Sequence, residues 1–395
     1  MDPRTNPFAP GAGTPPPELA GRDSVISDAD VALSRVKAGL PAKSQILLGL
    51  RGVGKTVLLN RVSDLARAQG YEVIELEAPE DRALPDMLVP PLRKLLFKLS
   101  TVENAKHLAH RSLAVLRSFA AAFKVKYADV EVGVSSPGTA DSGNLESDLP
   151  ELLVEVATAA KEAGVPIAMF VDEIQYLSEE DFAALIVADH KIAQRGLPFV
   201  LFGAGLPMVA GLAGEAKSYA ERLFDYPRVG PLPEPAAGEA IREPLRKHGI
   251  DIEPGALALI IEKTKGYPYF LQEWGYHSWN LARASTITAQ DAERATTEAL
   301  SRLDSGFFQV RWDRLTPRER DYMRAMAALG PGPHRSADIA TELGIQITSA
   351  APMRSNLIKK GMVYSPQHGD TAFTVPMFDE YMRRAMPKWI SRKSP

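Results

Sequence analysis

The sequence predicts an α/β fold, with a parallel sheet in the first part of the chain and helical regions in the rest. Short apolar runs without polar alternation are typical of strands buried on both faces; they are Gln45–Leu48, Tyr71–Leu76, Ile167–Val171 and Phe199–Phe202. Segments with apolar residues at helical spacing, such as Lys55–Gln69, lie between these runs. This order is expected of parallel strands joined by crossover helices. A helix capped by Ser178 is also expected at Glu179–Gln194, a further short strand at Tyr226–Val229, and part of a hairpin within Lys126–Val134.

The composition is typical of a soluble globular protein with its own hydrophobic cores. The chain has 395 residues, of which 45% are hydrophobic and 24% are charged, and this length predicts two or three domains. The net charge of -3 disfavours a protein that coats nucleic acid along its whole surface, although a local basic patch is compatible with it. No cysteine is present, which excludes disulfides, thiolate metal ligands and cysteine nucleophiles.

No targeting or membrane segment is expected, and the sequence predicts a cytoplasmic protein. Met1–Pro17 is rich in proline and glycine and lacks the apolar core of a signal peptide, so we expect a flexible or extended arm. The segment Gly196–Gly214 is long and uncharged, but Pro198 and Pro207 interrupt it. It is interpreted as a buried strand and a tight turn rather than a membrane span.

Residues 49–56 read Gly-Leu-Arg-Gly-Val-Gly-Lys-Thr and fit the phosphate-binding P-loop pattern in full. The glycines let backbone N–H groups turn inward around phosphates, and the following helix presents its positive end to the same anion. Lys55 is expected to add a positive charge at the β- and γ-phosphates, and the Thr56 hydroxyl to ligate Mg²⁺. The nucleotide-binding residues of this loop are Gly49, Arg51, Gly52, Val53, Gly54, Lys55 and Thr56.

A second motif ends the apolar strand that runs through Ile167–Val171. Two acids, Asp172 and Glu173, follow it directly, which is the Walker B pattern. Asp172 is expected to hold Mg²⁺ through water, and Glu173 to orient and activate the water that attacks the γ-phosphate. A solvent-exposed helix cap is the alternative, but ionised groups at the end of a buried strand need partners. Both motifs in this order predict an ATPase that uses ATP and Mg²⁺.

With these motifs the chain resembles the bacterial and archaeal AAA-type ATPases related to replication initiators. The resemblance covers about residues 17–386. It implies an α/β fold with a P-loop NTPase core of the ASCE/AAA type, then an all-helical lid and a winged-helix domain. The expected boundaries are a flexible arm at 1–17, the core at 18–232, the lid at 233–304 and the winged helix at 305–395.

The resemblance also implies an adenine-binding segment before the first helix. Residues 16–22, Pro-Pro-Glu-Leu-Ala-Gly-Arg, look like the family's segment that lines the adenine pocket. An ordered linker is the alternative. The residues concerned are Glu18, Leu19, Gly21 and Arg22.

In such ATPases an arginine from a neighbouring subunit reaches the γ-phosphate, and it lies just before the fifth core strand. Arg222 is the closest match to this catalytic position, and Arg228 is the second choice. A surface arginine paired with Glu221 is the alternative. The resemblance therefore implies self-association in the ATP state.

Two departures from the family pattern indicate slow hydrolysis and a switch-like use of ATP. The strand-end segment Gly203–Pro207 carries no polar sensor side chain. In place of the basic residue of the lid, the sequence has Gly266-Tyr267-Pro268. This Gly-x-Pro resembles the signalling (STAND-type) branch, in which the segment contacts the nucleotide and the next domain, so Pro268 is expected near the nucleotide. The alternative is a helix-initiating turn.

The last part of the chain reads as helix, helix-turn-helix and hairpin, which resembles the family's winged helix. The helices are expected at Thr316–Leu329, at Ala337–Leu343 with Ser336 as cap, and at about Ala350–Lys360, and the hairpin strands at Met362–Tyr364 and Ala372–Val375. DNA-binding versions place the third helix in the major groove. Double-stranded DNA is therefore a possible partner through Arg354, Lys359 and Lys360, and docking onto a protein is the alternative.

Overall fold

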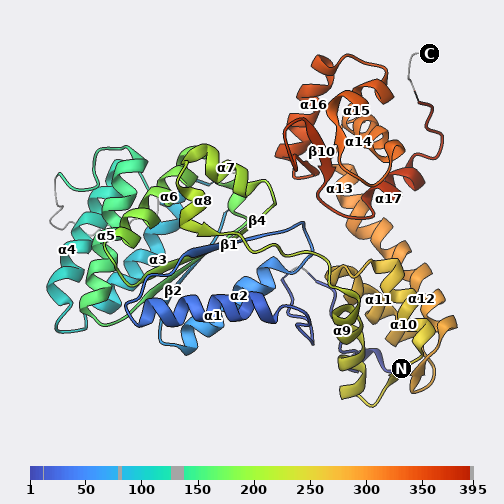
Figure 1. Ribbon diagram of the computed structural model, residues 1–395, viewed down its shortest axis with the longest axis horizontal. Helices are drawn as coiled ribbons and strands as arrows, with labels where there is room; N and C mark the ends of the chain where they lie inside the picture. The colour runs from blue at the N-terminus through green and yellow to red at the C-terminus, as the bar shows by residue number, and fades with distance from the viewer. Residues whose placement is uncertain (12, 79–81, 126–137, 392–395) are drawn as a thin grey trace. The chain divides into compact units, whose positions relative to one another are not determined.

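The computed structural model describes residues 1–11, 13–78, 82–125 and 138–391 (Figure 1). They form two compact units. The sheet unit consists of Arg22–Gly49 and Lys55–Val229, and the helical unit of Met1–Gly21, Leu50–Gly54 and Gly230–Pro395. The central part of the P-loop, Leu50–Gly54, is thus grouped with the helical unit by its contacts.

A five-stranded parallel sheet organises the sheet unit, with the strand order β2-β3-β4-β1-β5. The strands are β1 (Ser44–Leu48), β2 (Glu72–Glu77), β3 (Ile167–Asp172), β4 (Phe199–Gly205) and β5 (Phe224–Asp225). Every residue of β1 and β4 is buried, as expected for strands covered on both faces. The predicted α/β fold of the P-loop NTPase type is confirmed.

Helices cover both faces of this sheet (Figure 1). On one face lie α1 (Asp23–Lys37) and α2 (Lys55–Ala68), and on the other α3 (Leu84–Leu99), α5 (Leu145–Glu162) and α6 (Glu179–Gln194). The remaining elements are α4 (Lys106–Ala122), which packs on α3 and α5, η2 (Ile174–Tyr176), α7 (Val209–Ala216) and α8 (Ala220–Leu223). Parallel strands require such crossover helices because consecutive strands must start at the same edge.

The helix α3, for which the sequence analysis made no prediction, contains Pro90 and Pro91. Proline removes a backbone donor and normally interrupts a helix. Here the helix is nevertheless held by leucines that are buried in the core, among them Leu84, Leu88 and Leu92. Tertiary burial therefore outweighs the local preference.

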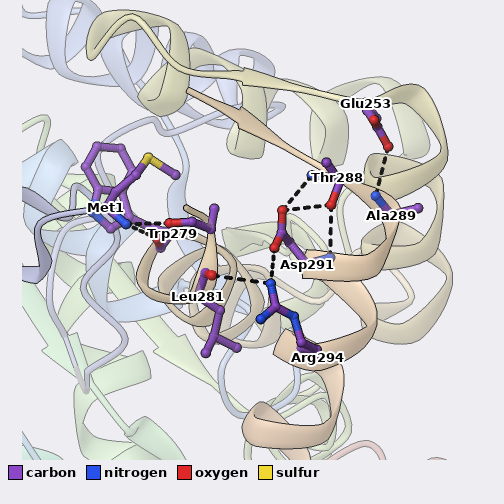
Figure 2. Close-up of polar contacts among 9 residues, drawn as sticks. Met1, Glu253, Trp279, Leu281, Thr288, Ala289, Asp291 and Arg294 are labelled. Carbon is purple, nitrogen blue, oxygen red and sulfur yellow. Dashed lines mark hydrogen bonds and ion pairs between the residues drawn. The ribbon is translucent and has the colours of Figure 1, made fainter. Parts of the chain in front are cut away.

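Residues 230–302 are mostly helical rather than all-helical. The helices are α9 (Glu234–Lys247), α10 (Pro254–Thr264), α11 (Pro268–Leu281) and α12 (Ala289–Arg302), and β6 (Asp251–Ile252) pairs with β7 (Thr286–Ile287) in parallel. A reciprocal cap starts α12, because the Thr288 hydroxyl accepts from Asp291 N–H at 3.2 Å and the Asp291 carboxylate accepts from Thr288 N–H at 3.0 Å (Figure 2). This cap satisfies two donors that the first helical turn leaves open.

The N-terminal arm, for which the composition predicts a flexible or extended segment, makes defined contacts. Its first residues, including η1 (Pro3–Thr5), are anchored to α11 within the helical unit. The Met1 amino group donates to the Trp279 carbonyl at 3.4 Å (Figure 2), and the Trp279 indole donates to the Asp2 carbonyl at 2.9 Å. Phe8 is 2% exposed, and a Cβ on Gly275 would lie 2.5 Å from its ring. Composition cannot reveal such burial against a distant helix.

The C-terminal part of the helical unit combines helices with a small antiparallel sheet of order β8-β10-β9. Its elements are η3 (Leu303–Phe308), α13 (Gln309–Asp313), α14 (Pro317–Leu329), β8 (His334–Arg335), α15 (Ser336–Leu343), α16 (Ile347–Lys359), β9 (Val363–Tyr364), β10 (Asp370–Phe373) and α17 (Phe378–Ala385). The sequence did not predict β8 or α17. Ser336 was expected to cap α15, but it is the first helical residue and its hydroxyl donates to the Gly369 carbonyl at 2.9 Å.

The apolar segment Gly196–Gly214 forms β4 and part of α7, as the strand interpretation expects. In the described part of the chain, no helix has the length and hydropathy that crossing a bilayer requires.

Candidate nucleotide site

The P-loop threonine and the Walker B aspartate meet within the sheet unit. Thr56 lies in the first turn of α2 and Asp172 ends β3. The Thr56 hydroxyl donates to the Asp172 carboxylate with an Oγ1–Oδ2 distance of 2.6 Å. Burial raises the pKa of Asp172, while the Thr56 hydrogen bond and the charge of Lys55 act in the opposite direction. A buried carboxylate of this kind gains stability from a cation beside it.

Glu173 occupies an unusual backbone conformation directly after β3. Its φ and ψ are 52° and 38°, the left-handed region, which a residue with a Cβ rarely adopts. Its N–H donates to the Asp172 carboxylate at 2.8 Å. Such conformations cost on the order of 1–3 kcal/mol and are concentrated at functional sites. The conformation is therefore compatible with a functional role for Glu173.

Gln175 is a site residue that the sequence analysis missed. Its side-chain NH₂ donates to the Glu173 carboxylate, and its side-chain oxygen accepts from Leu206 N–H at 3.1 Å. A Cβ on Gly205 would lie 3.0 Å from the Gln175 oxygen and 2.8 Å from Ile174. The end of β4 thus has no room for a side chain, because Gln175 occupies the space. Its position two residues after Glu173 is the one signal in the sequence.

Within the helical unit, three hydrogen bonds hold the central P-loop. The Tyr267 hydroxyl donates to the Arg51 carbonyl, and Tyr269 N–H donates to the Gly52 carbonyl at 3.2 Å. Arg51 N–H donates to the carbonyl of Thr374, which follows β10, at 3.3 Å. Gly52 has a φ of 81°, and a Cβ there would lie 3.2 Å from both tyrosines. A glycine is required at this close approach.

The Gly-x-Pro segment therefore contacts the loop through residues that were not predicted. Pro268 is the first residue of α11, as the alternative of a helix-initiating turn expects. Burial raises the pKa of Tyr267, so its hydroxyl stays protonated and can donate. Gly266 has a φ of 68°, and a Cβ there would lie 2.2 Å from the Leu232 carbonyl oxygen. No side chain fits at that position without a backbone shift.

The segment expected to line the adenine pocket is divided between the two units. In the helical unit, Glu18 pairs with Lys247 of α9 at 2.9 Å, and a Cβ on Gly21 would lie 2.6 Å from the Ala236 side chain. Leu19 is half-buried. Arg22 belongs to the sheet unit, where it precedes α1 and is buried.

The two candidate arginines lie at opposite edges of the parallel sheet. Arg222 is in α8, just before β5 begins at the edge where β1 also begins. Its side chain is exposed and forms no ion pair with Glu221 or another described residue. Arg228 follows β5 and lies beside Leu48, which precedes Gly49. Asp172 ends β3 at the carboxyl edge, so Arg222 is at the wrong edge to join its own Thr56 and Asp172.

The basic residues expected to contact DNA differ in their internal partners. The Arg354 guanidinium donates to the Thr371 hydroxyl at 2.8 Å and the Asp370 carbonyl at 2.9 Å, and the Lys360 ammonium pairs with Glu319 at 2.7 Å. Both charges are thus used to hold the helix α16 to its neighbours. Lys359 is exposed and has no hydrogen bond or ion pair with a described residue.

Two family models match the chain in separate parts. Residues 18–198 match the AAA ATPase domain, and residues 305–382 match a domain of unknown function (DUF8462). A curated relative is an uncharacterized HTH-type transcriptional regulator of Methanocaldococcus jannaschii, which is 23% identical over 90% of this chain and 86% of that protein.

Among solved structures, the Walker-type ATPase of Pyrococcus abyssi is similar with a TM-score of 0.56 at 19% identity, over 92% of this chain and 96% of that one. The Orc1 protein of Aeropyrum pernix, solved in complex with DNA, has a TM-score of 0.48 at 13% identity, over 93% of each chain. These likenesses concern the fold. The family match is separate from them, and it shows that residues 18–198 are similar to the AAA ATPase domain.

Proposed function

We propose that this protein is a magnesium-dependent ATPase that uses ATP as a switch. The observation that carries the proposal is the 2.6 Å contact between the Thr56 hydroxyl and the Asp172 carboxylate. Hydroxyl and carboxylate oxygens are ligands that Mg²⁺ prefers, and the ion usually takes its other ligands from water and phosphates. Among the described residues no group of three or more acids and histidines is placed to hold a metal alone, so the nucleotide would complete the site.

Each residue of the site has a distinct role in this proposal. Mg²⁺ would supply positive charge at the β- and γ-phosphates when bound. Lys55 is 6% exposed at the start of α2, where its ammonium would add to that charge. Asp172 and Thr56 would hold the ion, and Glu173 would take the proton of the attacking water.

Gln175 acts as a positioning residue in this proposal. Because it ties the Glu173 carboxylate to the end of β4, the change Gln175→Ala is expected to lower kcat about tenfold while KM for ATP stays nearly constant. Steady-state phosphate release measures both constants. Gln290→Ala, an exposed glutamine of α12, is the matched control. An unchanged kcat, or a loss confined to KM, contradicts the assigned role.

The contacts of the central P-loop support the switch. Tyr267 and Tyr269 at the start of α11 and Thr374 after β10 all hydrogen-bond to this loop. Binding of a nucleotide there would change the partners of Arg51 and Gly52. A ligand shifts the equilibrium between two conformations only if its interactions differ between them. These hydrogen bonds connect the loop to the C-terminal elements, and a change in them would provide that difference.

We also propose that residues 305–395 form a winged helix that engages double-stranded DNA. The order α14, β8, α15, α16, β9, β10 supports it, as does the name of the HTH-type relative. This part of the sequence contains 14 Lys and Arg against 8 Asp and Glu, a balance of +6. On α16, Thr348, Ser355 and Lys359 are exposed, and we assign base-edge contacts to the first two and a phosphate contact to Lys359.

A salt titration of duplex DNA binding, with and without ATP, tests this reading. Binding should weaken as salt rises, and Lys359→Ala should reduce the slope of log K against log salt by about one. Lys263→Ala, an exposed lysine of α10, should leave the slope unchanged. The absence of any duplex affinity at low salt in both nucleotide states would refute the DNA proposal.

A second candidate is a regulatory ATPase whose C-terminal domain docks onto a protein. Ile345, which lies two residues before α16, is 36% exposed, and Ile347, the first residue of α16, is 50% exposed. Apolar side chains at this position suit a protein interface better than a phosphate backbone. The same titration separates the two candidates, because protein docking predicts no salt-dependent duplex affinity.

A further inference from the structure

A cavity of about 500 Å³ lies in the sheet unit, away from the P-loop motif. It is at the amino edge of the sheet, where β1, β3 and β4 begin and where α1, α5 and α6 end. Its volume is within the range of about 300–1,000 Å³ that is usual for small-molecule sites. The Thr56–Asp172 pair lies at the carboxyl edge of the same sheet, so the two sites are separate.

Three connections of the same design line this cavity. They read Gly39-Leu40-Pro41, Gly164-Val165-Pro166 and Gly196-Leu197-Pro198. In each, a glycine with positive φ (74°, 71° and 57°) ends the helix. The apolar residue after it donates its N–H back to the last helical turn: Leu40 to Arg35 at 2.9 Å, Val165 to Ala160 at 3.0 Å and Leu197 to Ile192 at 3.3 Å. These are Schellman motifs, each followed by a proline.

These three connections determine which hydrogen-bonding groups and partial charges the cavity presents to a ligand. The N–H groups of Leu40, Val165 and Leu197 are already used, and the prolines have none. The connections therefore contribute apolar surface and few donors. The carboxyl ends of three helices also converge here, and each carries partial negative charge. The surroundings favour a ligand with an apolar body and a positive charge.

Asp189 of α6 places a carboxyl group among these apolar groups. It lines the cavity and is 4% exposed. One carboxylate oxygen accepts from the Ser44 hydroxyl at 2.8 Å, and Ser44 in turn accepts from Leu201 N–H at 2.9 Å. Burial raises the pKa of Asp189 to about 7. An ionised carboxylate in such a place is costly unless a positive group compensates it.

We propose that this cavity binds a small organic cation, with its ammonium on the Asp189 carboxylate and its alkyl body against Leu40, Val165 and Leu197. Lys37 and Lys161 also line the cavity, and the Lys37 ammonium donates to the Gln69 carbonyl at 2.5 Å. These two positive charges disfavour ligands with several positive charges. The ligand class is therefore a monovalent aliphatic amine.

The test compares three probes of one shape and different charge: n-hexylammonium, 1-hexanol and hexanoate. Hexylammonium should bind the wild-type chain with a Kd on the order of 1 mM, about tenfold more tightly than the other two, and it should shift the methyl NMR signals of Leu40, Val165 and Leu197. Equal binding of hexanol, or tightest binding of hexanoate, overturns the proposal. This comparison requires no variant.

Two further measurements identify Asp189 as the partner. Asp189→Asn keeps the shape and should weaken hexylammonium about tenfold while hexanol is unaffected. Asp64→Asn, an exposed aspartate of α2, is the matched control. Unchanged hexylammonium affinity in Asp189→Asn overturns the assignment.

The pH dependence gives an independent readout in the wild-type chain. Hexylammonium affinity should rise about tenfold between about pH 6 and about pH 8, because the Asp189 carboxyl loses its proton in this range. The other charged groups that line the cavity are Lys37 of α1 and Lys161 of α5. His190, the residue after Asp189, lies against Tyr219 with the ring centroids 4.3 Å apart. A flat profile, or a rise that persists in Asp189→Asn, contradicts the proposal.

Discussion

Replacing Glu173 by glutamine is expected to lower ATP turnover about 100- to 1,000-fold. The change removes the base that would accept the proton of the attacking water, while the amide keeps the shape of the side chain. Asp172 and Thr56 retain their 2.6 Å contact, so ATP and magnesium should still bind. Steady-state phosphate release and a nucleotide-binding titration measure the two effects separately.

The matched control for this change is Glu180→Gln. Glu180 is an exposed acid in the first turn of α6, and its replacement should leave turnover and ATP affinity as they are. If the Glu173→Gln chain hydrolyses ATP at the wild-type rate, Glu173 is not the base and the proposed mechanism is wrong. If it no longer binds ATP, the residue has a structural role instead.

Replacing Arg222 by alanine should lower turnover about 1,000-fold with ATP affinity nearly unchanged. Arg222 lies at the amino edge of the sheet, whereas Asp172 ends β3 at the carboxyl edge. An arginine in this position would serve the site of a neighbouring copy and not its own. The chain should therefore self-associate in the presence of ATP and magnesium.

A mixing experiment distinguishes a contribution in trans from one in cis. Arg222→Ala keeps its own Glu173, and Glu173→Gln keeps its Arg222, so a mixture of the two variants should recover part of the activity that each lacks. Arg228→Ala, in which the neighbour of Leu48 is changed, tests the second candidate arginine in the same assay. No recovery on mixing, together with a monomeric mass in ATP and magnesium, contradicts the role of Arg222.

The parts of the fold that local pattern controls agree with the sequence analysis. The helix expected at Glu179–Gln194 is α6, with the Ser178 hydroxyl accepting from Asp181 N–H at 3.0 Å.

The expected strand at Tyr226–Val229 is instead β5 at Phe224–Asp225, with a single further bridge between Arg228 and Leu48. Short strand ends depend on pairing with β1, and that pairing is not encoded in the strand itself.

Elements held by long-range contacts escaped prediction for the same reason. The strand β8 has two residues and exists because Arg335 and His334 pair with β10. The arm at Met1–Phe8 is ordered by burial of Phe8 against Gly275. Neither feature has a periodic signal, since each depends on a partner distant in the chain.

The candidate site likewise contains residues that local motifs predict and residues that only long-range contacts explain. Adjacent placement of Thr56 and Asp172 follows from two local motifs, because strands of a parallel sheet end at one edge. Gln175 and Tyr267 reach their partners across turns and between elements, so no spacing rule indicates them. Arg354 and Lys360 mislead because charge in a sequence does not reveal whether an internal acceptor already holds it.

The expected hairpin within residues 126–134 lies outside the described residues. So do the last basic residues of the sequence, Arg392 and Lys393, although both count toward the charge of the C-terminal part.

The central claim, that this chain hydrolyses ATP at the P-loop with Asp172 and Glu173, is tested most directly by a single-turnover experiment. The protein in excess is mixed with γ-labelled ATP and magnesium, and phosphate release is followed beside the Glu173→Gln variant. We expect stoichiometric release of phosphate by the wild-type chain, loss of that release when magnesium is chelated, and a rate lower by about 100- to 1,000-fold in the variant. Tight ATP binding without phosphate release, or equal release by both proteins, would contradict it.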